Sequence, residues 1–270
     1  MDKKKSAIGN ILVIVITAIM ALYPMVVPSF AVTKMNDVVR VMFNTLLGIG
    51  GVIVMKKVYG TEFKFKGIEV LKGIFGVWGL VFLPLVVLNL MGEHPMELTF
   101  VQAIPSLIIS MLTGILAGVS EELIFRGTVF NVFRERFGEG KRGILVAAVL
   151  SSAIFGAIHL TNLIFHPNLV VFVTSQVVYA ALFGIAFACA YYVTGNIWVV
   201  SVIHAIIDST SFFWRCFSKQ AGGEILPSQD IPFSVGVTNV VVIGFFAVSG
   251  LILLFIDFKK KEKKKLLTAK

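Results

Sequence analysis

Charged residues are scarce in this 270-residue chain: Asp, Glu, Lys and Arg make up 14% of it, against roughly 25% in soluble globular proteins. Apolar residues make up 57% and the mean hydropathy is +0.91, which is more apolar surface than one soluble core can bury. Only two cysteines are present, Cys189 and Cys216, in or at the end of apolar runs, so we expect no disulfide and no redox role. These shortages exclude a disordered chain and a disulfide scaffold, and they favour a lipid-embedded helical protein.

The basic excess is concentrated at the two ends of the chain. The formal net charge is +9, but three lysines fall within residues 3–5 and seven within residues 259–270. Lysine clusters beside apolar runs favour an anionic lipid surface. We therefore expect the lysine-rich termini to meet such a surface, and we expect no nucleic acid partner.

Eight apolar runs approach or exceed the roughly 20 residues that cross a bilayer. They cover residues 8–30, 38–55, 70–91, 100–133, 144–160, 169–193, 197–214 and 233–256. The first run has no convincing cleavage site after it, so we predict an uncleaved signal anchor. The fourth run is too long for one straight span, and we expect it to continue as a helix that emerges from the membrane. We predict an all-α fold, a single integral membrane domain over residues 1–270 with about eight transmembrane helices.

The distribution of Lys and Arg gives these helices an orientation. If the N-terminus is cytoplasmic, the inner segments hold 3 (residues 1–7), 5 (56–72), 4 (127–143) and 7 (258–270) basic residues, and the outer segments hold 4 in all. Basic residues concentrate in cytoplasmic loops. We therefore predict a multi-pass protein of the cell membrane with both termini in the cytoplasm.

Ionisable residues inside the apolar runs are candidate functional residues, because a charge at the bilayer centre costs roughly 2.5–3.5 kcal/mol on insertion scales. Glu122 and Arg126 are four residues apart, so they share a helix face and are expected to form a structural ion pair. Glu121 is rotated by about 100° and has Phe125 rather than a cation one turn on. This leaves Glu121 as a candidate general base or acid.

Two further runs carry polar pairs one helical turn apart. Phe155 and His159 share a face of the fifth run, and His204 and Asp208 share a face of the seventh. Taken singly, Phe155 is a packing residue, His159 a capping or interfacial histidine and Asp208 a hydrogen-bonded packing residue. Taken together, histidines and carboxylates from three helices could activate water and stabilise an oxyanion, or hold a metal. The sequence contains neither HExxH nor G-x-S-x-G, the patterns of helical zinc proteases and serine hydrolases.

The three segments together resemble the motifs of the CPBP family, the CAAX-prenyl-endopeptidase and bacteriocin-processing membrane proteases also called ABI or Rce1-like proteins. The matching segments are E-E-x-x-x-R at Glu121–Arg126, F-x-x-x-H at Phe155–His159 and H-x-x-x-D at His204–Asp208. Their order, their internal spacing and their positions on successive spans all agree with the family. The resemblance covers roughly residues 100–215, which are the expected catalytic core.

This resemblance implies an intramembrane endopeptidase that acts on membrane-associated peptides or proteins. It implies that Glu121 and His159 activate the attacking water, and that His204 and Asp208 steady the oxyanion or position their neighbours. The eukaryotic prenyl-protein branch usually has asparagine in place of Asp208, and an ionised carboxylate cannot donate a hydrogen bond as an amide does. Asp208 is therefore expected either to orient His204 or to be protonated, and a prenylated substrate does not follow from the motifs.

Members of the family have been described both as metalloproteases and as metal-independent glutamate proteases. Only two histidines fall in the motifs, and Glu122 is assigned to Arg126. We therefore expect no obligatory cofactor, with a divalent metal such as zinc as the alternative.

Two functions other than proteolysis remain open. A proton-coupled transporter would also carry buried Glu, His and Asp, although the chain shows no internal repeat of the kind that transporters often have. A non-catalytic membrane regulator or bacteriocin-immunity protein would use the same helices to bind a partner. Assay of the purified protein on a quenched peptide library, with and without chelator, distinguishes the three.

Overall fold

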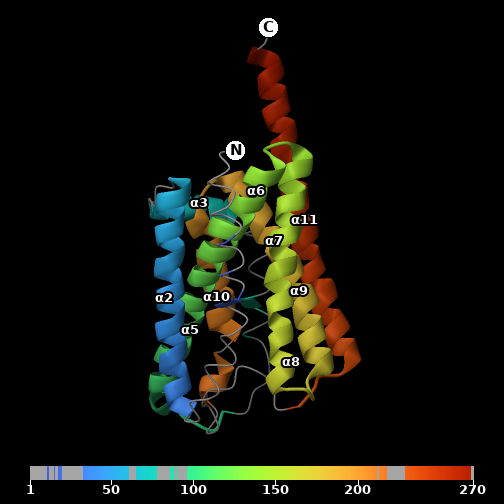
Figure 1. Ribbon diagram of the computed structural model, residues 1–270. Coiled ribbons are helices and arrows are strands. Elements are labelled where there is room, and N and C mark those ends of the chain that lie inside the picture. The colour runs from blue at the N-terminus through green and yellow to red at the C-terminus, as the bar shows by residue number, and fades with distance from the viewer. Residues whose placement is uncertain are drawn as a thin grey trace. The chain divides into compact units, whose positions relative to one another are not determined.

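The computed structural model describes residues 11, 15, 18–19, 33–60, 65–77, 86–87, 90, 96–211, 213–217 and 229–268. Throughout these residues the regular elements are helices (Figure 1). The predicted all-α membrane bundle is thereby confirmed. The predicted first span lies almost wholly outside the described residues and the third in large part, so the count of eight stays a prediction.

Within the described residues, five helices are long and apolar enough to cross a membrane. They are Val41–Tyr59, Phe100–Phe137, Lys141–Ile164, Val170–Thr194 and Phe233–Thr268, and they coincide with the second, fourth, fifth, sixth and eighth predicted runs. The helix at the seventh run, α10 (Ile197–Ser211), is apolar but has only 15 residues. At 1.5 Å per residue it is about 22 Å long, shorter than a bilayer's hydrocarbon core of about 30 Å.

Contacts between residues divide the chain into two compact units. The first unit comprises residues 1–21, 128–196 and 229–270, and the second comprises residues 22–127 and 197–228, as far as these ranges are described. The candidate residues Glu121, Glu122, Arg126, His204 and Asp208 all fall in the second unit. Phe155 and His159 fall in the first.

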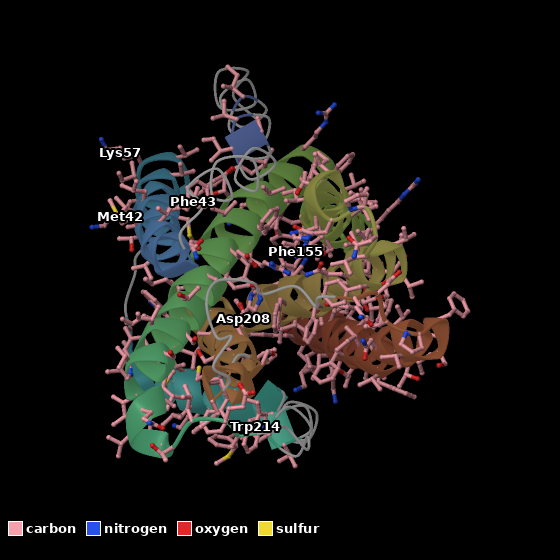
Figure 2. The ribbon with its side chains drawn as sticks, turned by 90° about the horizontal axis from the view of Figure 1, so that it is seen from below. Met42, Phe43, Lys57, Phe155, Asp208 and Trp214 are labelled. Atoms are coloured by element: carbon pink, nitrogen blue, oxygen red, sulfur yellow. The ribbon has the colours of Figure 1, made fainter. Side chains whose placement is uncertain are left out.

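In the second unit, α5 packs against both α2 and α10. The elements of this unit are α2 (Thr33–Tyr59), α3 (Gly67–Val77), α5 (Phe100–Ile124), α10 (Ile197–Ser211) and the 3-10 turn η3 (Trp214–Phe217). Figure 2 shows Met42 and Lys57 on the outer side of α2 and Phe43 on the side toward α5. The capping box of Thr99 and Gln102, in which each side chain bonds the other residue's backbone N–H, begins α5.

A π-helical segment, η1 (Phe125–Phe130), follows directly after α5 and leads into α6 (Asn131–Phe137). The uninterrupted helix from Phe100 to Phe137 has 38 residues and is about 57 Å long. This agrees with the prediction that the fourth run is too long for one straight span. π-helical turns are rare and frequently lie at functional sites.

The first unit is built around α9. Its elements are α6 (Asn131–Phe137), α7 (Lys141–Ile158), the 3-10 turn η2 (His159–Thr161), α8 (Asn162–Phe165), α9 (Val170–Thr194) and α11 (Phe233–Thr268). Helix α9 packs against α7 on one side and α11 on another. Its close approaches use small residues: a Cβ at Gly184 would lie 2.6 Å from the Cβ of Ser152, and one at Gly250 would lie 2.9 Å from the Cα of Ala186.

Asp230, which precedes α11, caps the start of α9. Its carboxylate accepts hydrogen bonds from the backbone N–H groups of Val171 at 2.9 Å and Phe172 at 2.8 Å. Desolvation raises the pKa of Asp230, but these N–H donors and that of Ile231 outweigh it and hold the pKa below its ordinary value. The cap also joins the beginnings of two helices that are about 60 residues apart in sequence.

Candidate active site

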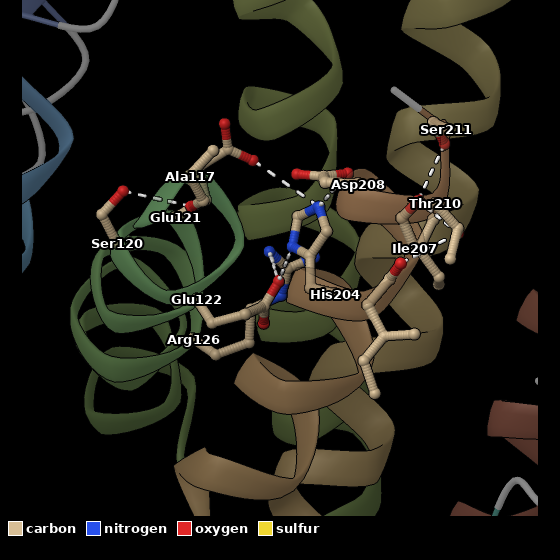
Figure 3. Close-up of polar contacts among 11 residues, drawn as sticks. Ala117, Ser120, Glu121, Glu122, Arg126, His204, Ile207, Asp208, Thr210 and Ser211 are labelled. Carbon is tan, nitrogen blue, oxygen red and sulfur yellow. Dashed lines mark hydrogen bonds and ion pairs between the residues drawn. The ribbon is translucent and has the colours of Figure 1, made fainter. Parts of the chain in front are cut away.

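The last turn of α5 and the middle of α10 together present the polar residues of the site (Figure 3). Helix α5 carries Glu121 and Glu122 at adjacent positions, so their side chains leave the helix about 100° apart. Helix α10 carries His204 and Asp208 one turn apart. Glu122 is fully buried at 0% exposure, whereas the side chains of Glu121 and Asp208 are 23% and 25% exposed.

Close packing by glycine sets the distance between these two helices. Gly118 lies one turn before the two glutamates, and a Cβ there would lie 2.5 Å from the backbone nitrogen of Ala205. A Cβ at Gly114 would lie 2.7 Å from the backbone nitrogen of Ser209. Ala205 and Ser209 directly follow His204 and Asp208 in sequence, so the backbone carrying the α10 site residues can rest against α5 only because both positions lack a side chain.

Glu122 joins Arg126 to His204 in a buried chain of charge-assisted contacts. Arg126 Nη1 lies 2.9 Å from Glu122 Oε1, and His204 Nδ1 lies 2.8 Å from the same oxygen. The guanidinium of Arg126 is a donor only, so the Glu122 oxygen that it faces is an acceptor. His204 Nδ1 is therefore the donor in this contact, and Glu122 fixes both the orientation of the ring and the position of that proton.

The other ring nitrogen of His204 faces the two remaining carboxylates. His204 Nε2 lies 3.6 Å from Asp208 Oδ1 and 3.8 Å from Glu121 Oε2. Both distances exceed the range of a direct hydrogen bond, and at such separations a water or substrate atom can mediate the contact. The result is an imidazole nitrogen flanked by two partly exposed carboxylates.

The contact between Glu122 and His204 does not follow from local spacing in the sequence. The spacing of Glu122 and Arg126 suggested a pair complete in itself, and the two residues do lie at ion-pair distance. The histidine that shares the glutamate comes from a helix 82 positions further along the chain. The same histidine, His204, also lies near Glu121, and the residues of the helix that carries Glu121 do not indicate this.

His159 occupies the first residue of η2, directly after α7. Its Nδ1 lies 3.1 Å from the carbonyl oxygen of Phe155, so this nitrogen is the donor, because a carbonyl only accepts. The two rings meet edge to face, with centroids 5.5 Å apart and planes at 89°. Phe155 is buried and packs on the ring.

The described residues contain no group of three or more His, Cys, Asp or Glu side chains placed to hold a metal ion. In the second unit, the contacts of Glu122 occupy His204 Nδ1, and Glu122 itself is shared with Arg126. On the other side of the ring, Nε2 lies 3.8 Å from Glu121 Oε2 and 3.6 Å from Asp208 Oδ1. That the protein needs no obligatory metal stays a prediction, which assay of its activity with and without a chelator tests.

Comparison with known proteins places the three motifs in one family. Residues 103–210 match the family model described as type II CAAX prenyl endopeptidase Rce1-like. This segment is similar to the Rce1-like family. The family resemblance inferred from the motifs is thereby confirmed. A search of curated proteins and a search of solved structures found no match.

The Rce1-like segment contains every residue of the candidate site. Its boundaries at residues 103 and 210 enclose most of α5, all elements from η1 to α9, and nearly all of α10. The family is one of membrane endopeptidases, which agrees with a helical chain that carries several membrane-length apolar helices. Within the matched segment, the carboxylate of Asp208 lies beside His204 Nε2.

Proposed function

We propose that this protein is an intramembrane endopeptidase that hydrolyses peptide bonds of membrane-associated peptides or proteins. The observation that carries the proposal is the arrangement around His204, whose Nδ1 is held by the buried Glu122 and whose Nε2 faces Glu121 and Asp208. The match of residues 103–210 to the Rce1-like family supports the same reaction class.

Glu121 is the proposed general base. Glu122 is completely buried, and its Oε1 already lies 2.9 Å from the guanidinium of Arg126 and 2.8 Å from His204 Nδ1, so its charge is balanced inside the protein. Glu121 is partly exposed and lies in the same turn of α5, where it can accept a proton from a bound water. The resulting hydroxide attacks the carbonyl carbon of the scissile bond.

His204 is the proposed donor to the tetrahedral intermediate. Because Glu122 fixes Nδ1–H, a second proton on Nε2 would point toward the space between Glu121 and Asp208, where it can bond the developing oxyanion. Collapse of the intermediate breaks the C–N bond, and the proton taken from water passes to the leaving amine. We assign His159 a share in handling that proton, as the resemblance implies.

Of the two roles considered for Asp208, orienting His204 and donating to the oxyanion, the distances around the ring favour the second. Glu122, at 2.8 Å from Nδ1, already orients the His204 ring, whereas Asp208 lies 3.6 Å from Nε2. We therefore assign Asp208 to the oxyanion side of the ring. A protonated Asp208 donates to the oxyanion alongside His204, while an ionised Asp208 accepts from Nε2–H and competes with the oxyanion.

The proposal is tested by assaying the purified full chain, in detergent and in proteoliposomes, on a quenched peptide library with and without chelator. Wild-type cleavage that survives chelation supports a water activated by Glu121. Cleavage lost on chelation and restored by zinc supports the metal alternative. No cleavage of any peptide, combined with saturable binding of one, would favour the membrane regulator or immunity protein.

We also propose that the protein crosses the cell membrane several times with both termini in the cytoplasm. The asymmetry of Lys and Arg between alternate segments supports this orientation. Reporter fusions at residue 95 and at Lys270 should report opposite compartments. Fusions that report the same side would contradict the predicted order of spans.

A further inference from the structure

The lysine-rich end of the chain continues the helix of α11. This helix runs from Phe233 to Thr268, so it is about 54 Å long, against a hydrocarbon core of about 30 Å. Its apolar part, residues 233–256, is about 36 Å long and suffices to cross that core. The lysines that begin at Lys259 therefore fall at the depth of the lipid headgroups. The C-terminal end of α11 extends past α7 and α9 (Figure 1).

Two contacts hold this basic end against α7 and α9, and a third lies within α11 itself. Lys261 Nζ lies 2.7 Å from Asp257 Oδ2, one turn back on α11, and 4.4 Å from the centre of the Tyr192 ring on α9. Lys141 Nζ, at the start of α7, lies 2.7 Å from Glu262 Oε1. These contacts place Lys259–Lys265 beside the turn between α6 and α7.

That turn is itself basic, and the two segments form one positively charged surface. Residues 134–142 contain four basic and two acidic residues, and residues 259–265 contain six basic and one acidic. The guanidinium of Arg134 lies 5.5 Å from the centre of the same Tyr192 ring that Lys261 covers. The Tyr192 ring therefore contacts one cation from each basic segment and brings the two segments together. We call residues 134–142 and 259–265 the basic surface.

Glu262 marks the side of α11 that faces α7, so lysines on the opposite side of the helix point away from the rest of the unit. Glu262 faces Lys141 on α7, and at 100° per residue Lys260 and Lys264 project about 160° away from it on either side. Lys259 and Lys263 lie on one flank between these directions. All four lysines are exposed, so they are available to groups outside the protein.

We infer that the basic surface binds the anionic headgroups of phospholipids in the adjoining leaflet. Its position directly after a membrane-length apolar helix favours lipid over a soluble acidic partner, because headgroup phosphates lie at the same depth. Lysines near an anionic membrane surface contribute about 1 kcal/mol each, equivalent to about fivefold in binding constant. The same surface forms whether or not the chain is a protease.

The test measures thermal unfolding of the full chain in a non-ionic detergent during titration with phosphatidylglycerol or phosphatidylcholine. The test variant replaces Lys259, Lys260, Lys263 and Lys264 by Gln, leaving the Lys261 and Glu262 contacts in place. A second variant replaces the same four lysines by Arg. A control replaces Lys56 and Lys57, an exposed pair at the end of α2, by Gln.

Phosphatidylglycerol should raise the unfolding temperature of the wild type, and the rise should shrink between about 0.1 M and about 1 M salt. The four-Gln variant should need at least about tenfold more of this lipid for the same rise, whereas the Arg variant and the Lys56/Lys57 control should respond as the wild type does. An equal response to phosphatidylcholine, or an unchanged response of the four-Gln variant, would overturn the inference. So would an equal rise with inorganic phosphate or with polyglutamate, which would indicate a phosphate site or an acidic protein partner.

Discussion

Removal of Arg126 is the perturbation whose effect the structure specifies best. Its side chain is 1% exposed and that of Glu122 is 0% exposed. Arg126→Ala would leave a carboxylate in this buried position without the guanidinium. Breaking a buried ion pair by removing one partner typically costs about 3–5 kcal/mol, a large part of a total stability of about 5–15 kcal/mol.

A solvent-exposed ion pair provides the matched control. Arg134 Nε lies 2.7 Å from Glu139 Oε1, a contact shorter than that of Arg126, but these side chains are 33% and 63% exposed. Surface pairs contribute about 0–1 kcal/mol. Arg134→Ala should therefore leave the yield and unfolding temperature nearly unchanged, while Arg126→Ala lowers both sharply.

The double variant Glu122→Leu/Arg126→Met separates loss of charge balance from loss of packing. Replacing both members of a buried pair by apolar residues is often neutral or stabilising, so the double variant should recover folded protein relative to Arg126→Ala. It should still be inactive, because His204 loses its Nδ1 acceptor. The assays are size-exclusion yield, thermal unfolding and peptide cleavage. An Arg126→Ala protein that folds normally but cleaves nothing would refute the structural role and indicate that Arg126 contacts substrate.

Three further predictions concern the helix contacts and charges around the site and the first unit. Gly118→Ala should reduce kcat much more than it alters KM, because the new Cβ would push against the backbone of Ala205 next to His204. The control is Gly51→Ala, whose Cβ would meet the side chain of Leu123 at 2.8 Å and which should lower stability alone. Equal kcat values in the two variants would contradict this prediction. Asp208→Asn should retain or increase cleavage if Asp208 acts as a protonated donor, and a large loss would show that the carboxylate is needed. Asp230→Asn should lower the unfolding temperature at neutral pH, because a carboxylate whose folded pKa is depressed stabilises the fold above its unfolded pKa of about 3.9. That difference should disappear as the pH falls through the lower folded pKa, and a difference that persists in acid would exclude the charge as its cause.

The sequence predicted those features of the site that depend on local spacing. The four-residue interval between Glu122 and Arg126 places them on one face of an α-helix, and the same interval places His204 near Asp208. Long apolar runs predicted the membrane helices for a similar reason, because burial in lipid imposes both length and composition. The three motifs were enough to indicate the family.

The features that local spacing did not predict come from packing between distant segments. His204 reaches Glu122 because Gly114 and Gly118 let the α10 backbone lie against α5, and a glycine in an apolar run does not reveal which helix it faces. The π-helical turns that carry Arg126 have no sequence signature comparable to an ion-pair spacing. Asp230 at the start of α9 is a third case, since a cap supplied from about 60 residues away follows only from the tertiary structure.

The most direct test of the proposed mechanism compares Glu121→Gln with Glu69→Gln in the cleavage assay. Both changes replace a carboxylate by an amide of nearly the same size in the second unit, but Glu69 is exposed and pairs with Lys66 on the surface. The account predicts that Glu121→Gln folds like the wild type and loses cleavage by about two to four orders of magnitude, the usual effect of a general base, while Glu69→Gln remains fully active. Full activity in a folded Glu121→Gln protein would contradict the assignment of Glu121 as the base and with it the proposed mechanism.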